Sequence, residues 1–92
     1  MTKFELTESL AHIQKISVRE AKSIVDTILA TMTDAMLRGH NVEIRGFGSF
    51  QVRQYDSYVG RNPKTGQQIK VRPKKLPFFK PGKDLREQMN KN

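Results

Sequence analysis

The sequence has no cysteine, no long apolar run and few acidic side chains in its second half. Without cysteine, neither a disulfide framework nor a thiolate metal site can form, which fits the reducing cytoplasm. No apolar stretch approaches the roughly 18 residues of a membrane span, and no signal-peptide core follows Met1. We therefore expect neither a disulfide scaffold nor a membrane protein.

Motifs of catalysis are also missing. His12 and His40 have no clustered carboxylates beside them, so they are not expected to hold a metal. The serines lie in no nucleophile motif. Five residues separate Gly60 from Gly66, and Gln67 follows, so this segment does not match a phosphate-binding P-loop. We predict no enzyme, catalytic residue, metal, cofactor or small-molecule substrate.

Positive charge is plentiful, and it is confined to one half of the chain. Residues 1–46 hold six basic and six acidic side chains, whereas residues 47–92 hold eleven basic and three acidic ones. The whole net charge of +8 therefore lies in the second half. This asymmetry indicates a polyanionic partner, either nucleic acid or an anionic membrane surface. The alternative is a basic surface that only aids solubility.

The first half predicts a pair of helices within residues 1–40. Thr2–Glu5 and Ser17–Glu20 fit capping boxes, and apolar residues recur at helical spacing behind each. We expect the second helix to run for about 21 residues. Gly39 should end it, with Arg38 in the last turn, where a cation suits the helix dipole.

The apolar stripe of the second helix is wider than the short first helix can cover. Once residues 53–75 are set aside, too little chain remains for an independent core. Domains below roughly 70–80 residues are seldom stable without disulfides, a structural metal or oligomerisation. We predict a dimer about a two-fold axis, and a small two-layer monomer is the alternative. The stripe residues expected between the subunits are Ile28, Leu29, Met32 and Met36.

From residue 41 onward the spacing of apolar residues changes from helical to alternating, and this pattern predicts an antiparallel sheet. Polar and apolar residues alternate over 42–45 and 49–53, on either side of a glycine turn. Pro73 and Pro77 interrupt a third apolar stretch and suit an edge strand. The predicted fold is α+β in one domain over residues 1–92. It has two N-terminal helices, a three-stranded antiparallel sheet with a long arm within 41–80, and a short helix over 82–91.

Residues 53–75 contain seven cations and one acid, and few of them could reach a core. We predict a two-stranded ribbon with GRNPKTG (residues 60–66) at its tip, marginal in water and mobile until it is bound. Pro63 offers a rigid apolar ring without an N–H, which suits insertion between base pairs. Arg61 and Asn62 can donate to acceptors in the minor groove. A plain turn proline is the alternative.

Three segments together resemble a known family. RGFGSF at residues 45–50, GRNPKTG at 60–66 and FKPGK at 79–83 are similar, in order and spacing, to the bacterial HU and integration host factor DNA-binding proteins. The resemblance covers nearly the whole chain. It implies an intertwined dimer of HU-like fold in the bacterial nucleoid, with two arms that bend double-stranded DNA by placing Pro63 between base steps.

The resemblance also implies which residues contact DNA. The insertion would be flanked by Arg61, Asn62 and Lys64. Phosphates along the body would be met by Lys3, Arg45, Gly46, Lys80, Lys83 and Arg86. The arm would be lined by Arg53, Lys70, Arg72, Lys74 and Lys75. The dimer core would contain Phe47, Phe50 and Phe79.

The segment 55–59 departs from the family, because many members are more basic there. Tyr55 and Tyr58 can donate hydrogen bonds to phosphate without carrying charge, so we expect a weaker salt dependence than a fully basic arm would give. Residues three apart along a strand lie on opposite faces, so both tyrosines cannot contact DNA together.

Our first interpretation is a homodimeric nucleoid protein that bends and compacts DNA with little sequence preference. The alternative within the family is a β-like subunit of a site-specific heterodimer of the integration host factor type. Outside the family, a membrane-surface module is disfavoured because the long helix carries mixed charge. A single-stranded RNA reader is disfavoured because few aromatics are interleaved along the strands.

Overall fold

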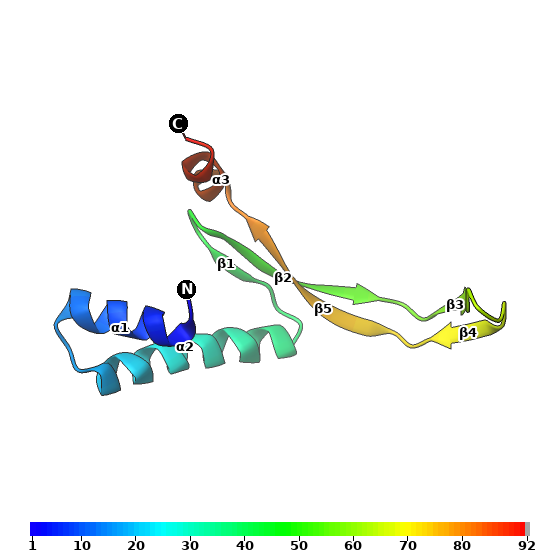
Figure 1. Cartoon of the computed structure of the whole chain (residues 1–92), viewed down its shortest axis with the longest axis horizontal. Coiled ribbons are helices and arrows are strands. Elements are labelled where there is room, and N and C mark those ends of the chain that lie inside the picture. The colour runs from blue at the N-terminus through cyan, green and yellow to red at the C-terminus, as the bar shows by residue number, and fades with distance from the viewer. Residues whose placement is uncertain (92) are drawn as a thin grey trace. The chain divides into compact units, whose positions relative to one another are not determined.

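In this computed structural model, residues 1–91 are described, and they form three helices and five strands (Figure 1). Their bounds are α1 Lys3–Gln14, α2 Val18–Leu37, β1 Val42–Ile44, β2 Gly48–Tyr55, β3 Tyr58–Arg61, β4 Gln68–Val71, β5 Lys74–Pro81 and α3 Lys83–Met89. The chain divides into two compact units, one comprising Met1–Arg38 and the other beginning at Gly39. The predicted α+β order of elements is confirmed.

Side-chain caps start both long helices: the predicted capping box is complete at Thr2, and at Ser17 the structure gives the Ser17 half of the predicted box. The Glu5 N–H donates to Thr2 Oγ1 (3.1 Å), and the Thr2 N–H donates back to Glu5 Oε1 (3.2 Å). At the start of α2, Ser17 Oγ accepts from the Glu20 N–H at 3.0 Å. Each contact satisfies a donor that the first helical turn would otherwise leave unpaired.

The end of α2 differs slightly from the prediction. The helix has 20 residues, and Arg38 is its C-cap rather than a member of the last turn. The reason is that Gly39 has φ +81°, a left-handed conformation that ends the helical hydrogen-bond pattern. The Arg38 guanidinium still pairs with Asp34 of the last turn, with Nη2 3.0 Å from Oδ2.

The helical unit buries very little of its own apolar surface. Within the described chain, the buried apolar residues are Ala11, Ala21 and Val25. Ile28 and Leu29 of the apolar stripe remain 53% and 40% exposed. Burial of three small side chains contributes little free energy at about 25 cal/mol per Å² of apolar surface. The unit therefore carries an apolar surface that a single chain leaves open.

The second unit contains an antiparallel sheet of order β1-β2-β5. Pro77 lies in β5, opposite Val52 of β2, and β5 is an edge strand, as predicted from its prolines. At the other edge, Asn41 Oδ1 accepts from the Val52 N–H at 3.1 Å. This side chain continues the β1–β2 ladder beyond the first residue of β1.

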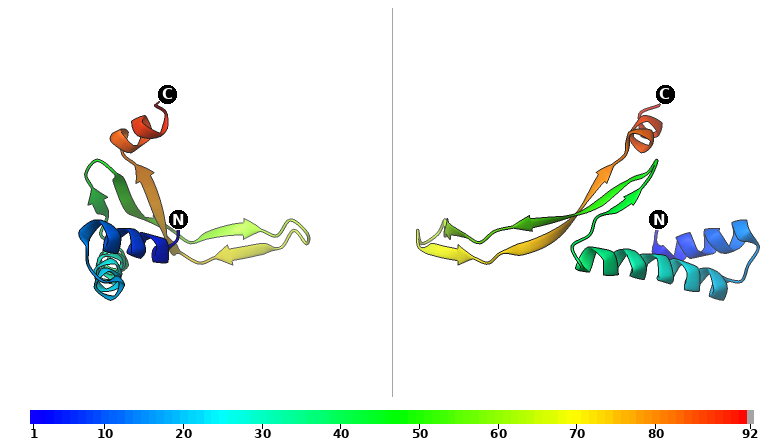
Figure 2. Two further views of the ribbon diagram at one scale, coloured as in Figure 1. Left: turned by 60° about the vertical axis from the view of Figure 1, so that its left-hand side comes forward. Right: turned by 180° about the vertical axis from the view of Figure 1, so that it is seen from behind.

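The arm continues the sheet as a second ladder of β3 and β4, which Figure 2 shows as one long ribbon with β2 and β5. The β2–β5 pairing ends at Tyr55↔Lys74, and the β3–β4 pairing begins at Tyr58↔Val71. Two residues are therefore skipped on each strand, and the register continues in phase. The predicted ribbon is confirmed, but it is interrupted where Pro73 has no N–H to donate.

Aromatic residues hold the base of the sheet together. The Phe79 ring centroid lies 4.8 Å from that of Phe50 and 5.5 Å from that of Phe47, and both pairs are tilted. The Gly82 N–H donates to the Phe47 carbonyl at 2.9 Å, which ties the start of α3 to the β1–β2 turn. Gly82 is the N-cap, so α3 is shorter than the predicted 82–91 at both ends.

Candidate nucleic-acid interface

Strand register separates the ribbon into two faces, because directly paired residues lie on the same side of an antiparallel sheet. Ser49 pairs with Lys80, Gln51 with Phe78, Arg53 with Leu76 and Tyr55 with Lys74. Since the pairing resumes in phase, the same side continues along the arm with the pairs Val59↔Lys70 and Arg61↔Gln68. We call it the basic face, defined by Ser49, Gln51, Arg53, Arg61, Lys70, Lys74 and Lys80.

The opposite face is apolar for much of its length. On the sheet it carries the Phe50–Phe79 and Val52–Pro77 pairs. On the arm it carries Tyr58–Val71 and Gly60–Ile69. A Cβ added to Gly60 would meet Tyr58 Cε2 at 3.5 Å, so the tyrosine ring lies beside this glycine.

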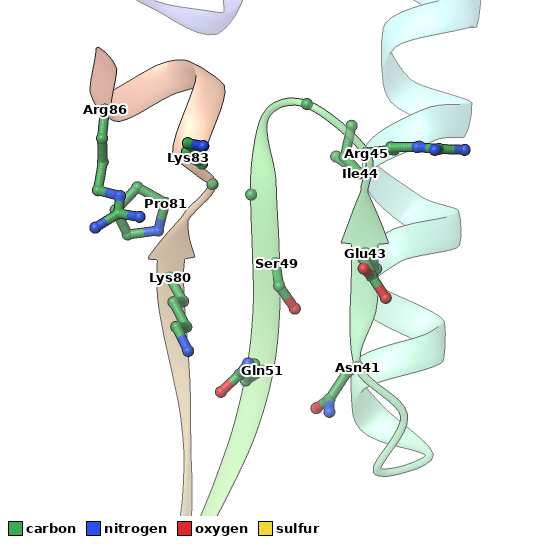
Figure 3. Close-up of a pocket in the computed structure, with 13 residues that line it drawn as sticks. Asn41, Glu43, Ile44, Arg45, Ser49, Gln51, Lys80, Pro81, Lys83 and Arg86 are labelled. Carbon is green, nitrogen blue, oxygen red and sulfur yellow. The ribbon is translucent and has the colours of Figure 1, made fainter.

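The basic face ends in an open hollow of about 510 Å³ at the base of the sheet. Figure 3 shows it between β1, β2, β5 and the start of α3. Among the residues that line it, Glu43 is acidic, and the basic ones are Arg45, Lys80, Lys83 and Arg86. Neutral hydrogen-bonding side chains come from Asn41, Ser49 and Gln51. A cationic hollow of this kind suits a phosphate backbone, which arginine, lysine and neutral polar side chains all contact.

An aromatic ring supports one cation of the basic face. Arg53 Cζ lies 3.5 Å from the centroid of the Phe78 ring, a cation–π geometry. Phe78 is 38% exposed, so the stacked pair forms part of the surface. The ring restrains the position of the guanidinium on this face, and a stacked guanidinium keeps its N–H donors in its own plane, free to bind phosphate.

The tip of the arm is a closed loop. The Asn62 N–H donates to the Gln67 carbonyl at 2.8 Å, and the Gly66 N–H donates to the Asn62 carbonyl at 2.7 Å. Gly66 has φ +72°, a conformation that glycine adopts without strain. Pro63 lies inside this loop and is exposed.

The structure brings together most of the predicted contact residues. Arg45, Gly46, Lys80, Lys83 and Arg86 line the hollow. The basic face adds Arg53, Arg61, Lys70 and Lys74, whereas Arg72 lies in the break between β4 and β5.

Three of the predicted residues lie elsewhere. Lys75 pairs with Gln54 on the opposite face, and Tyr58 lies on the apolar side of the arm. Tyr55 and Tyr58 lie on opposite faces, as expected, although they belong to two strands. Lys3 belongs to the helical unit, where its Nζ lies 2.6 Å from Asp26 Oδ1.

Four polar side chains of the hollow were missed from the sequence, namely Asn41, Glu43, Ser49 and Gln51. Strand alternation alone would have found two of them, because Ser49 and Gln51 lie at even spacing from Arg53 on the same face. The other two come from β1 and the residue before it, and only the sheet order places them beside β2.

Two lysines converge on Asp26 in the helical unit. Lys22 Nζ lies 2.6 Å from its Oδ2, and Lys3 Nζ lies 2.6 Å from its Oδ1. Hydrogen bonding from Lys22, and then from Lys3, lowers the pKa of the Asp26 carboxyl below its usual value. The cluster links α1 to α2 at the protein surface.

This lowered pKa predicts a small, pH-dependent contribution to stability. Because the folded state favours the ionised carboxylate, the contribution is present above the unfolded pKa of about 3.9 and is lost as the pH falls through the folded-state value. Asp26→Asn should melt slightly below wild type at neutral pH and low salt, and the two should converge in acid. Asp34→Asn is the matched control, since Asp34 pairs with Arg38 at the C-cap of its own helix and does not link two helices. Equal melting curves at neutral pH would contradict the prediction.

No group of three potential metal ligands occurs among residues 1–91, and no helix in that range is long and apolar enough to cross a membrane. A basic hollow, a basic face that resumes in phase along the arm, and a proline-tipped arm are the features of an architectural DNA-binding protein. The chain matches the family "Bacterial DNA-binding protein" over residues 1–90. It belongs to this family of HU and integration host factor proteins, which are not enzymes, and the predicted family and non-enzymatic nature are confirmed.

Individual relatives support the same assignment. The chain is 47% identical to the integration host factor subunit beta of Paraburkholderia phymatum, over 100% of this chain and 87% of that protein. It is 48% identical to the same subunit of Cupriavidus pinatubonensis, over 100% of this chain and 68% of that protein. Among solved structures, Anabaena HU in a cocrystal with DNA matches with a TM-score of 0.84 and 32% identity, covering 100% of both chains. The predicted HU-like fold is therefore confirmed.

Proposed function

We propose that this chain is the β-type subunit of a heterodimer of the integration host factor type, which bends DNA at preferred sites. The observation that carries this proposal is the identity of 47–48% to integration host factor β subunits over the whole chain. Identity to Anabaena HU over the same length is 32%. The relatives thus favour our alternative interpretation over a homodimeric protein of low specificity.

The open apolar surface supports a dimer. A single chain leaves Ile28 and Leu29 of α2 exposed, and Phe47 at the base of the sheet is 44% exposed. Burial of such side chains is worth about 1.5–3 kcal/mol each, so a second chain that covers them would supply the missing core. We place Ile28, Leu29, Met32, Met36, Phe47, Phe50 and Phe79 in that shared core.

DNA would lie along the basic face. Lys80, Lys83 and Arg86 in the hollow would neutralise phosphates and release counterions, which supplies much of the affinity. The arm would follow the minor groove, with Arg61 and Lys70 directed toward the duplex. Pro63 would enter a base step and kink the duplex. Preference for particular sites would then come largely from how easily their sequences deform. We accordingly place the protein in the nucleoid.

Expression with and without a partner tests the proposal. The chain should form a stable dimer with a paralogous α-type chain and remain aggregated, or dimerise poorly, when it is produced alone. Light scattering after gel filtration reports the assembly. Competition between a specific site and a scrambled duplex of equal length reports the preference. A stable homodimer that binds both duplexes equally would instead support the low-specificity HU interpretation.

A further inference from the structure

We propose that Asn62 is a positioning residue that fixes Pro63 at the apex of the arm through its side-chain carbonyl. Its role in the proposed function, on which this inference rests, would then be to aim the wedge. This differs from the sequence-based expectation that Asn62 donates to bases in the groove.

Three hydrogen bonds converge on Asn62. Its N–H donates to the Gln67 carbonyl (2.8 Å), and its own carbonyl accepts from the Gly66 N–H (2.7 Å). In addition, its side-chain Oδ1 accepts from the Lys64 N–H at 2.9 Å. Asn62 is also half-buried, whereas Arg61 and the residues from Pro63 to Gln67 are exposed. The residue is thus the centre of the tip rather than one of its free side chains.

The bond to Lys64 closes a turn that contains Pro63. Asparagine followed by two residues, with Oδ1 bound to the second N–H, forms an Asx turn. Proline has no N–H of its own, so its backbone nitrogen cannot anchor the ring to the loop. The Asn62 side chain spans the proline and joins the residues on both sides of it. The direction of the ring relative to the ribbon therefore depends on this contact.

Side-chain length separates the two possible roles of Asn62. Serine places an oxygen at a similar distance from the backbone and can form the equivalent, weaker turn, but it has no amide. Glutamine keeps the amide donor and can reach a groove acceptor, but its extra methylene carries the carbonyl away from the Lys64 N–H. A positioning role favours serine, and a base-donating role favours glutamine.

The experiment compares wild type, Asn62→Ser and Asn62→Gln in the purified dimer. Bending is measured by energy transfer between dyes at the two ends of a short duplex at saturating protein. Affinity is measured on intact duplex and on duplex nicked at the kink site. Hydrogen exchange of the Lys64 amide in the free protein reports the turn itself, and thermal melting reports overall stability.

We expect Asn62→Gln to bend less than Asn62→Ser. Its affinity for intact duplex should fall by roughly two- to tenfold, the loss of one net hydrogen bond, with a smaller loss on nicked DNA. The Lys64 amide should exchange faster in the glutamine variant, while the melting temperature is unchanged. Thr65→Val is the matched control, since Thr65 Oγ1 accepts from the Gln67 N–H (3.3 Å) beyond the proline, and it should bend like wild type.

The inference is overturned if Asn62→Gln bends DNA as well as, or better than, Asn62→Ser. Failure of the proposed function gives a different result, because wild type itself would then bend a specific and a scrambled duplex alike, or leave both unbent. In that case hydrogen exchange of the Lys64 amide still tests the inference. Equal exchange rates in wild type and Asn62→Gln would show that the Asn62 side chain does not hold the turn.

Discussion

Gly48→Ala is expected to destabilise the sheet by about 3 kcal/mol, at the upper end of the usual cost of overpacking. A Cβ at this position would lie 2.6 Å from two ring atoms of Phe79 and 2.7 Å from the Lys80 backbone oxygen. The ring is held between Phe47 and Phe50, and the oxygen belongs to the paired strand, so neither can move aside easily. The melting temperature should fall by roughly 10 °C or more.

Gly60→Ala provides the matched control for this measurement by circular dichroism. An added Cβ there meets its nearest neighbour at 3.5 Å, an ordinary contact, on the arm rather than at the base of the sheet. Its melting temperature should stay close to that of wild type. If both alanine variants melt together, close packing of Phe79 against Gly48 does not limit stability.

Pro63→Ala is expected to lose most of the DNA bend while affinity changes by less than about tenfold. The proline ring would pry base steps apart, whereas the phosphate contacts proposed for the basic face would remain and would supply a large share of the binding free energy. Minor-groove wedges of this family are known to kink DNA by roughly 20–90°. Circularisation of short DNA fragments at saturating protein measures the change.

Lys80→Ala should give the reverse pattern. Removing one phosphate contact should weaken binding and reduce the slope of log affinity against log salt by about 0.9, while the bend at saturation persists. Unchanged ring closure by Pro63→Ala would show that the proline does not produce the kink. An unchanged salt slope for Lys80→Ala would show that this lysine does not contact phosphate.

Much of the fold could be predicted because helix starts, helix ends and the edge strand are each marked by residues that act on the neighbouring backbone. Thr2 and Ser17 mark helix starts by chemistry that acts within one turn, and Gly39 marks a stop by its backbone freedom. Pro77 indicated an edge strand for a similar local reason. The break between the sheet and the arm was not predicted, because Pro73 interrupts the ladder only when the register places it opposite Asp56.

The candidate site was predictable in composition but not in arrangement. The basic residues could be named because charge is visible in the sequence. Strand alternation separates Lys74 from Lys75, but placing Lys74 on the same face as Arg53 required the pairing of β2 with β5, which is a contact between distant residues. The contact from Asn62 to Lys64 was missed because both groove donation and turn formation use the same side chain. The identity of the chain that covers Ile28 and Leu29 could not be predicted either, because it depends on a second molecule.

The in-phase break between Tyr55↔Lys74 and Tyr58↔Val71 limits how such arms can change in length. Adding one residue to each strand at this junction would turn Arg61 and Lys70 to the apolar side, because side chains alternate with a period of two. Adding two residues to each strand would restore them. Natural variation in arm length among proteins built this way should therefore proceed in even steps.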